Sequence, residues 1–326
     1  MREDHLPEVW RPEEREDVEP PARAAEVAAL KRRFYSKFDI MSFQRRRRKF
    51  WNLNFAESTL DIVSEVREVV SANSKFPNSS LIPHSWDELP PGTFLWRARE
   101  MNGRAVTHVE ISESDLWEPP KSVVSPGRFN LSGQPLLYAC KALPIDTLSE
   151  ARVTGSDTPF ILVGYETVEP LYLRRVGVTS DPSITPRQQR IEIALSEFLA
   201  QVVSIPEEDL GPLTYGFTQR ILEYYYELEP NWESGWMYRS TRIKPAPQIE
   251  MDPLNVALEP SAARSKLRVM NVILGTYHGH DENGHHVQLA AYSNGLRSKR
   301  DFLEFEAFPH DRIDSLQGYF DFLYGV

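Results

Sequence analysis

Residues 127–152, GRFNLSGQPLLYACKALPIDTLSEAR, predict a turn, a strand and a short helix in immediate succession. Gly127 comes directly before Arg128 in the turn, and a glycine at such a place lets the backbone approach a ligand closely. The planar guanidinium of Arg128 can hold a phosphate or a carboxylate through two parallel hydrogen bonds. The turn is therefore a candidate anion-binding site.

The strand and the helix after this turn add an aromatic ring and a carboxylate. Tyr138 projects from one face of the strand, because successive strand side chains point to opposite faces. Asp146 is the expected N-cap of a helix that presents Glu150 after its first turn. Two interpretations stay open for this pattern: a cleft with chemistry, or a salt bridge at the edge of the core.

The rest of the chain predicts short strands and separate helices without a regular βαβ rhythm, which favours an α+β fold. The helix over 185–203 has Thr185 as its expected N-cap and an apolar stripe on one face. A β-hairpin is expected around Asn283-Gly284. Strands are expected at 93–100, 134–140, 158–168, 171–176 and 255–258, and further helices at 214–226 and 311–325.

Composition changes along the chain predict four regions. Residues 1–20 are acidic and proline-containing, which is typical of a tail. Helices at 22–38 and 58–70, the second with Ser58 as its expected N-cap, indicate a small helical N-terminal module over 21–90. A mixed α+β domain is expected over 91–260, followed by a C-terminal extension of a β-hairpin and a helix over 261–326, packed on that domain.

The bulk properties are those of a globular protein that stays inside the cell. Of the 326 residues, 41% are hydrophobic and 26% are charged. We expect a cytoplasmic protein without a membrane span, because the N-terminus is charged and no long apolar run is present. The single cysteine, Cys140, fits that compartment and is interpreted as a small buried residue. The net charge of −10 argues against broad nucleic-acid binding.

A run of basic residues with aromatic residues on both sides lies between the two expected N-terminal helices. The run Arg45–Lys49 is flanked by Phe43, Phe50 and Trp51. Such a pattern can clamp a nucleic-acid backbone and stack bases on the rings. The favoured interpretation is a solvated helix face whose aromatic side chains enter the core.

A group of histidines near the expected hairpin tip raises the question of a metal site. The group consists of His278, His280, His285 and His286, together with Asp281 and Glu282. Hairpin arms can bring imidazoles together around a metal ion. A polar hairpin tip explains the same residues, and no metal ligand set is predicted.

Seven fragments in order resemble the signature of the RES family, which is named after arginine, glutamate and serine. They are WRAR at 96–99, PP at 119–120, GRFNLSG at 127–133, LLY at 136–138, TLSEAR at 147–152, YRS at 238–240 and NVAL at 255–258. The resemblance identifies residues 91–260 as a RES domain. It implies a mixed β core with flanking helices, similar to ADP-ribosyltransferases. Arg239 departs from the pattern, because proline is frequent at that position.

The resemblance also implies roles for individual residues. Glu150, Arg128, Tyr138 and Ser240 match the family's catalytic set. The dinucleotide-binding set comprises Arg97, Gly127, Arg128, Asn130, Tyr138 and Ser240. Glu150 would stabilise the ribosyl cation, the two arginines would hold the pyrophosphate, and Tyr138 would stack on the nicotinamide.

The implied function is an NAD⁺ glycohydrolase, a hydrolase that acts as a toxin or defence effector. NAD⁺ is then a substrate, and no bound cofactor is expected. An antitoxin or another regulatory protein is the expected partner, as in toxin–antitoxin systems. Two alternatives stay open: transfer of the ADP-ribosyl group to a protein or to phosphate, and a non-catalytic binding module whose helical N-terminus contacts RNA or protein.

Overall fold

The computed structural model describes residues 29, 32–55, 61–72, 84–101, 111–125, 127–130, 132–153, 155–176, 185–205, 234–240, 242–243, 253–281, 284–295, 298–299 and 302–307. The chain divides into two compact units. The first comprises Met1–His84, Gly177–Val202 and Glu207–Asn231; the second comprises Ser85–Val176, Val203–Pro206 and Trp232–Val326. The expected tail and the helices at 214–226 and 311–325 lie outside the described residues.

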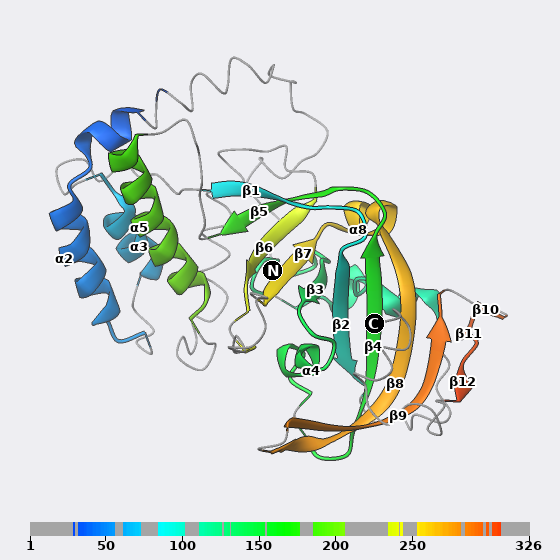
Figure 1. Cartoon of the computed structure of the whole chain (residues 1–326). Helices are drawn as coiled ribbons and strands as arrows, with labels where there is room; N and C mark the ends of the chain where they lie inside the picture. The colour runs from blue at the N-terminus through cyan, green and yellow to red at the C-terminus, as the bar shows by residue number, and fades with distance from the viewer. Residues whose placement is uncertain are drawn as a thin grey trace. The chain divides into compact units, whose positions relative to one another are not determined.

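The described part of the first unit is mainly helical. Residues 32–37, the described end of the helix expected at 22–38, are helical. They are followed by α2 (Ile40–Trp51), α3 (Ile62–Val70) and α5 (Pro186–Val203), which lie side by side in Figure 1. The apolar stripe expected on α5 is buried, and its Phe198 ring lies 6.3 Å from Phe43 and 5.2 Å from Phe50, measured between ring centroids. Burial of these aromatic side chains holds α5 against α2.

The start of α3 differs from the expectation. Its N-cap is Asp61, whose side chain accepts a hydrogen bond from the Ser64 amide at 3.1 Å. The expected cap, Ser58, lies outside the described residues. Aspartate and serine are both good N-caps, so the sequence pattern alone offered two starting points, and Asp61 stands directly before the first helical residue.

The basic run on α2 has a structural role at its centre. Arg46 is 7% exposed, and its guanidinium donates to Ser42 Oγ at 2.6 Å and to the backbone oxygens of Ser71 at 2.7 Å and Val69 at 3.3 Å. These carbonyls lie at the C-terminal end of α3, where helical carbonyls lack partners within the helix. Arg46 therefore ties the end of α3 to α2.

Two of the three aromatic residues beside this run point into the core, as the favoured interpretation predicted, while Trp51 is half-buried. Phe43 and Phe50 are fully buried. Lys49 forms ion pairs with Glu65 at 3.5 Å and Glu68 at 3.3 Å. Neither phenylalanine ring can stack on a base, so these residues do not form the aromatic platform of an RNA-binding surface.

One large sheet dominates the second unit (Figure 1). Within the described residues its strand order is β1-β5-β6-β7-β3-β2-β4-β8-β9-β12. β5 and β6 pair in parallel, and every pair from β6 to β12 is antiparallel. The strands are β1 (His84–Leu89), β2 (Phe94–Glu100), β3 (Leu137–Lys141), β4 (Thr158–Thr167), β5 (Leu171–Val176), β6 (Gly235–Arg239), β7 (Leu254–Leu258), β8 (Leu267–Asp281), β9 (Gly284–Asn294) and β12 (Glu306–Ala307).

Short elements complete the described part of this unit. They are the 3₁₀ turns η3 (Glu113–Leu116) and η4 (Lys121–Val123), the helices α4 (Asp146–Glu150) and α8 (Pro260–Lys266), and the paired strands β10 (Ser298–Lys299) and β11 (Phe302–Leu303). The fold is thus mixed α+β, as expected. None of the described helices has the length and apolar content needed to cross a bilayer.

The division of the chain differs from the expected boundaries in two places. The segment Gly177–Val202 groups with the N-terminal helices, because the buried stripe of α5 packs on them. The expected extension from residue 261 begins with α8 and continues into the sheet, since β8 pairs with β4 from Tyr277 to Leu267. The hairpin of β8 and β9 is confirmed.

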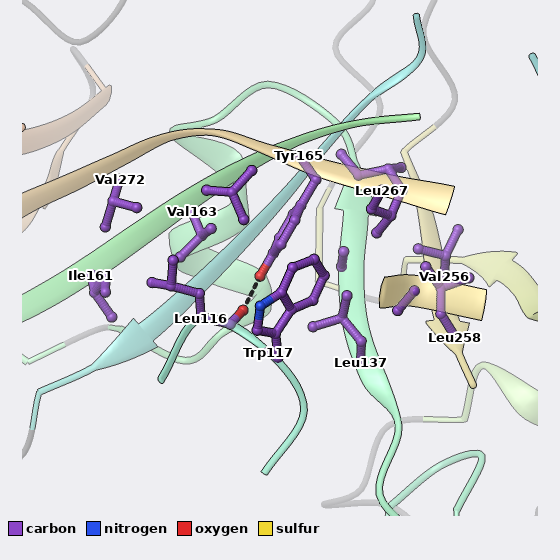
Figure 2. Packing of buried hydrophobic residues seen from close by; sticks show 14 of the residues in the cluster. Leu116, Trp117, Leu137, Ile161, Val163, Tyr165, Val256, Leu258, Leu267 and Val272 are labelled. Atoms are coloured by element: carbon purple, nitrogen blue, oxygen red, sulfur yellow. Dashed lines mark hydrogen bonds between the residues drawn. The ribbon is translucent and has the colours of Figure 1, made fainter. Parts of the chain in front are cut away.

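Each face of the sheet carries its own apolar cluster. The larger cluster contains Leu137, Ala139, Val163, Met237 and Val256 and lies around Trp117 and Tyr165 (Figure 2). The smaller cluster includes Trp96, Leu148, Leu162 and Ile273, so α4 covers this second face. Since strand side chains alternate, the clusters show which face each remaining side chain occupies.

Candidate active site

The face of the sheet that α4 covers carries a row of polar and aromatic side chains. On β7, Leu254, Val256 and Leu258 belong to the larger cluster, which leaves Asn255 on the α4 face. The same alternation on the neighbouring strands places Tyr138, Cys140, Trp236 and Tyr238 there. Cys140 and Tyr238 are both the direct cross-strand partners of Asn255.

Ser240 and Glu150, two of the expected catalytic residues, are in direct contact. The hydroxyl of Ser240 donates to Glu150 Oε2 at 2.5 Å. The same Oγ accepts from the amides of Ile243 at 3.0 Å and Arg242 at 3.2 Å. Because these two donors occupy its lone pairs, the hydroxyl hydrogen is directed at the carboxylate. The backbone after β6 therefore fixes one oxygen of Glu150.

A cation that the sequence interpretation missed lies on the other side of this carboxylate. Arg242 Nη1 is 2.8 Å from the backbone oxygen of Glu150 and 3.6 Å from its Oε1. The Glu150 side chain is 20% exposed and that of Arg242 is 29% exposed. Nothing local in the sequence marks Arg242, because its role depends on where the chain after Ser240 meets the end of α4.

Helix α4 is short and begins differently from the expectation. It spans Asp146–Glu150, and its N-cap position is Ile145, so Asp146 lies in the first turn and is not the cap. Leu148 is fully buried in the smaller cluster, which fixes the orientation of the helix. Glu150 is the last residue of the helix, and its side chain reaches Ser240.

The turn at residues 127–130 is built as a closed hydrogen-bonded unit. Tyr138 donates to Asn130 Oδ1 at 2.8 Å and accepts from the Phe129 amide at 2.9 Å. Asn130 Nδ2 donates to the backbone oxygen of Ser125 at 3.0 Å. A Cβ on Gly127 would lie 2.3 Å from Asn130 Oδ1. Glycine is therefore required here by this close packing, and Tyr138 braces the turn through its hydroxyl.

Arg128 and Glu150 both act electrostatically on the buried Tyr238. Burial raises the pKa of Tyr238 well above its ordinary value; Tyr138 and Glu150 raise it further, and Arg128 opposes them. The Tyr238 ring packs on Phe129 with 4.5 Å between ring centroids. Tyr238 thus packs on the arginine turn and lies within the electrostatic reach of Glu150, and its position two residues before Ser240 could have indicated this.

The Arg128 side chain is half-buried, and its Nη1 donates to the backbone oxygen of Val203, which belongs to the same unit. A guanidinium carries five N–H donors in a planar fork, and this bond uses one of them. The structure therefore holds Arg128 in place on the turn.

Arg97 does not join this group. Its neighbour Trp96 is paired with Cys140 and packs with Leu148, so Trp96 takes the α4 face of β2. Arg97 points to the opposite face, where its Nη1 donates to the Trp117 backbone oxygen. There burial raises the pKa of Tyr165, and the charge and hydrogen bonding of Arg97 oppose that shift. Figure 2 shows Trp117 and Tyr165 within the larger cluster.

Cys140 is a buried thiol, as the sequence indicated. It is 1% exposed and contacts Ala142 and Ile243. Burial, Glu150 and Asp146 all raise its pKa. Since only the thiolate is a good nucleophile, Cys140 is unsuited to covalent catalysis.

The histidines of the β8–β9 hairpin do not form a metal centre within the described part of the chain. No group of three or more His, Cys, Asp or Glu side chains able to hold a metal was found there. His278 Nδ1 lies 2.7 Å from Asp157 Oδ1, on the surface. The side chain of His285 lies outside the described residues.

Comparison with known proteins adds no relative. No family model matches the chain, no curated protein matches it, and no solved structure matches it. The candidate site is therefore defined by its geometry alone, which brings together Glu150, Ser240 and Arg242 beside Tyr238 and the turn that carries Arg128.

Proposed function

We propose that this chain is an NAD⁺ glycohydrolase of the RES family with an ADP-ribosyltransferase-like fold. The observation that carries the proposal is the 2.5 Å hydrogen bond between Ser240 and Glu150. These residues match the serine and the glutamate of the resemblance and come from distant parts of the chain. An accidental match of short fragments would give no reason for the two side chains to meet.

The chemistry of the reaction suits a held carboxylate. Cleavage of the bond between nicotinamide and ribose passes through an oxocarbenium-like cation, and the leaving ring is already cationic. A preorganised negative charge beside the sugar stabilises that cation. Ser240 occupies one acceptor site of Glu150, and a carboxylate has about four such sites. The remaining acceptor sites can accept hydrogen bonds from the ribose hydroxyls and from the attacking water, which they orient.

The turn at 127–130 supplies the second half of the site. Arg128 is a permanent cation and can grip an anionic group of the dinucleotide. The network of Gly127, Asn130 and Tyr138 keeps that turn in one conformation, so less conformational entropy is lost when a ligand binds. Arg97 is left out of this proposal, because it lies on the opposite face of the sheet.

Such an enzyme depletes NAD⁺ in the cytoplasm and acts as a toxin or defence effector. An antitoxin or regulatory protein then keeps it inactive. NAD⁺ is the substrate and no further cofactor takes part. Expression of the active chain should arrest growth, and the Glu150→Ala variant should not.

The decisive experiment is incubation of the pure protein with NAD⁺, followed by chromatography of the products. Free nicotinamide with ADP-ribose supports hydrolysis. ADP-ribosylated protein, or ADP-ribose phosphate formed in phosphate buffer, identifies transfer at the same site. Unchanged NAD⁺ at high enzyme concentration overturns the proposed function.

A further inference from the structure

Asn255 is a buried carboxamide without hydrogen bonds. The residue is 2% exposed, and neither Oδ1 nor Nδ2 has a partner. Among the described side chains with buried orphan atoms, it is the one in which both an acceptor and a donor are orphaned. Each unsatisfied buried group destabilises the folded state by about 1–3 kcal/mol. A residue with two such groups is therefore expected to have a function that offsets this loss of stability.

The position of Asn255 in the strand does not require a polar residue. Its cross-strand neighbours on the same face, Cys140 and Tyr238, are both buried. An apolar side chain of the same size would remove both orphan groups and keep the packing. The carboxamide is therefore explained better by a ligand than by the fold.

The surroundings of Asn255 place it at the candidate active site. Its cross-strand partners are Tyr238 on β6 and Cys140 on β3. The carboxylate of Glu150 acts electrostatically on both partners. The Ser240 amide donates to the backbone oxygen of Pro253, so Ser240 is a diagonal neighbour of Asn255.

We infer that Asn255 recognises the carboxamide of the nicotinamide ring and thereby determines specificity; this rests on the proposed NAD⁺ cleavage. An asparagine side chain offers two N–H donors and a carbonyl acceptor. A primary carboxamide offers the same groups and can pair with it through two antiparallel hydrogen bonds. Both atoms of Asn255 are shielded from solvent, so neighbouring side chains shift when the ring binds.

Asn255 should distinguish between two dinucleotides that differ in one chemical group. Nicotinic acid adenine dinucleotide carries a carboxylate in place of the carboxamide. A carboxylate has no donor for Asn255 Oδ1 and brings a negative charge against it, which is repulsive. The parent enzyme should therefore prefer NAD⁺, because sites built to hydrogen-bond a group reject analogues that lack it.

The test compares kcat/KM for the two dinucleotides in the full-length parent, Asn255→Leu and Asn255→Ala. We expect a preference for NAD⁺ of about 100-fold in the parent and below about fivefold in both variants. The ratio within one variant is an internal control, since damage to the fold lowers both rates alike. Asn255→Leu should also keep or raise the melting temperature, because it removes two orphan groups.

Asn271 provides a matched control. It is also 2% exposed and has one orphan oxygen, but it lies on β8 opposite Gly164. Asn271→Ala should keep the parental preference. If the parent cleaves NAD⁺ and Asn255→Leu keeps the preference, the assignment of Asn255 is wrong while the proposed function stands. If the parent cleaves neither dinucleotide, the proposed function itself fails.

Discussion

Ser240 and Glu150 are 90 residues apart in the sequence and share a hydrogen bond of 2.5 Å. Two backbone amides donate hydrogen bonds to Ser240 Oγ, so the hydroxyl hydrogen of Ser240 is directed at Glu150. The Glu150 side chain is 20% exposed. The pair therefore holds the Glu150 carboxyl group in one orientation, with part of the side chain exposed.

Replacing Glu150 with Gln should lower the rate of NAD⁺ cleavage by about 10²–10³-fold, the scale for loss of one preorganised electrostatic group. Glutamine can still accept from Ser240, so the fold and NAD⁺ binding should persist, measured by calorimetry. Glu166→Gln is a matched control, because Glu166 is also 20% exposed and ion-paired with an arginine, Arg268. Equal rates in Glu150→Gln and the parent would contradict the assigned role.

Arg242 should act as a positioning residue for Glu150. Its guanidinium contacts the backbone oxygen of Glu150 at 2.8 Å, so Arg242→Ala should loosen the end of α4 and lower kcat about tenfold. KM should change less, because Arg242 holds the acid and not the dinucleotide. Arg242→Lys should restore part of kcat. A fall confined to KM would instead indicate direct binding of substrate.

Gly127→Ala should destabilise the turn, since its Cβ would lie 2.3 Å from Asn130 Oδ1. Overpacking of this kind typically costs about 1–3 kcal/mol, measurable by urea denaturation. In an Asn130→Ala background the same change should cost less, because the clashing atom is gone. Strictly additive effects of the two substitutions would show that this contact is not the cause.

Arg46→Ala should lower the free energy of unfolding by about 3 kcal/mol, because it leaves buried backbone oxygens of Val69 and Ser71 without donors. Arg45→Ala removes an exposed neighbour on the same helix and should change stability by less than about 0.5 kcal/mol. Chemical denaturation of both variants measures the difference. Similar losses in the two variants would contradict the structural role of Arg46.

Asp146 should give a pH-dependent stability effect. Burial raises its pKa in the folded state, so the folded chain holds this proton more tightly than the unfolded chain. The stability it contributes is present below the unfolded pKa of about 3.9 and is lost as pH rises through the folded pKa. Asp146→Asn should therefore melt higher than the parent at pH 7, and the gap should close near pH 3. A gap of equal size at both pH values would point to another cause.

Local sequence patterns predicted about half of the described elements of the second unit, and they missed β1, β6 and α8. Apolar and alternating runs predicted β2, β3, β4, β5 and β7, because strand patterning is a local property. The glycine–arginine turn and the helix that carries Glu150 were also readable locally. Helix starts were less certain, as Asp61 and Ile145 show, since several neighbouring residues can serve as caps.

Which side chains meet depends on contacts between distant parts of the chain, so local sequence patterns could not show it. Alternation shows that Trp96 and Arg97 point to opposite faces of β2, but not which of them faces α4; the pairing of Trp96 with Cys140 and the packing on Leu148 decide that. Arg242 and Ser240 meet Glu150 for the same reason. Strand order and register are set by long-range packing, and one residue of register exchanges the two faces of a strand.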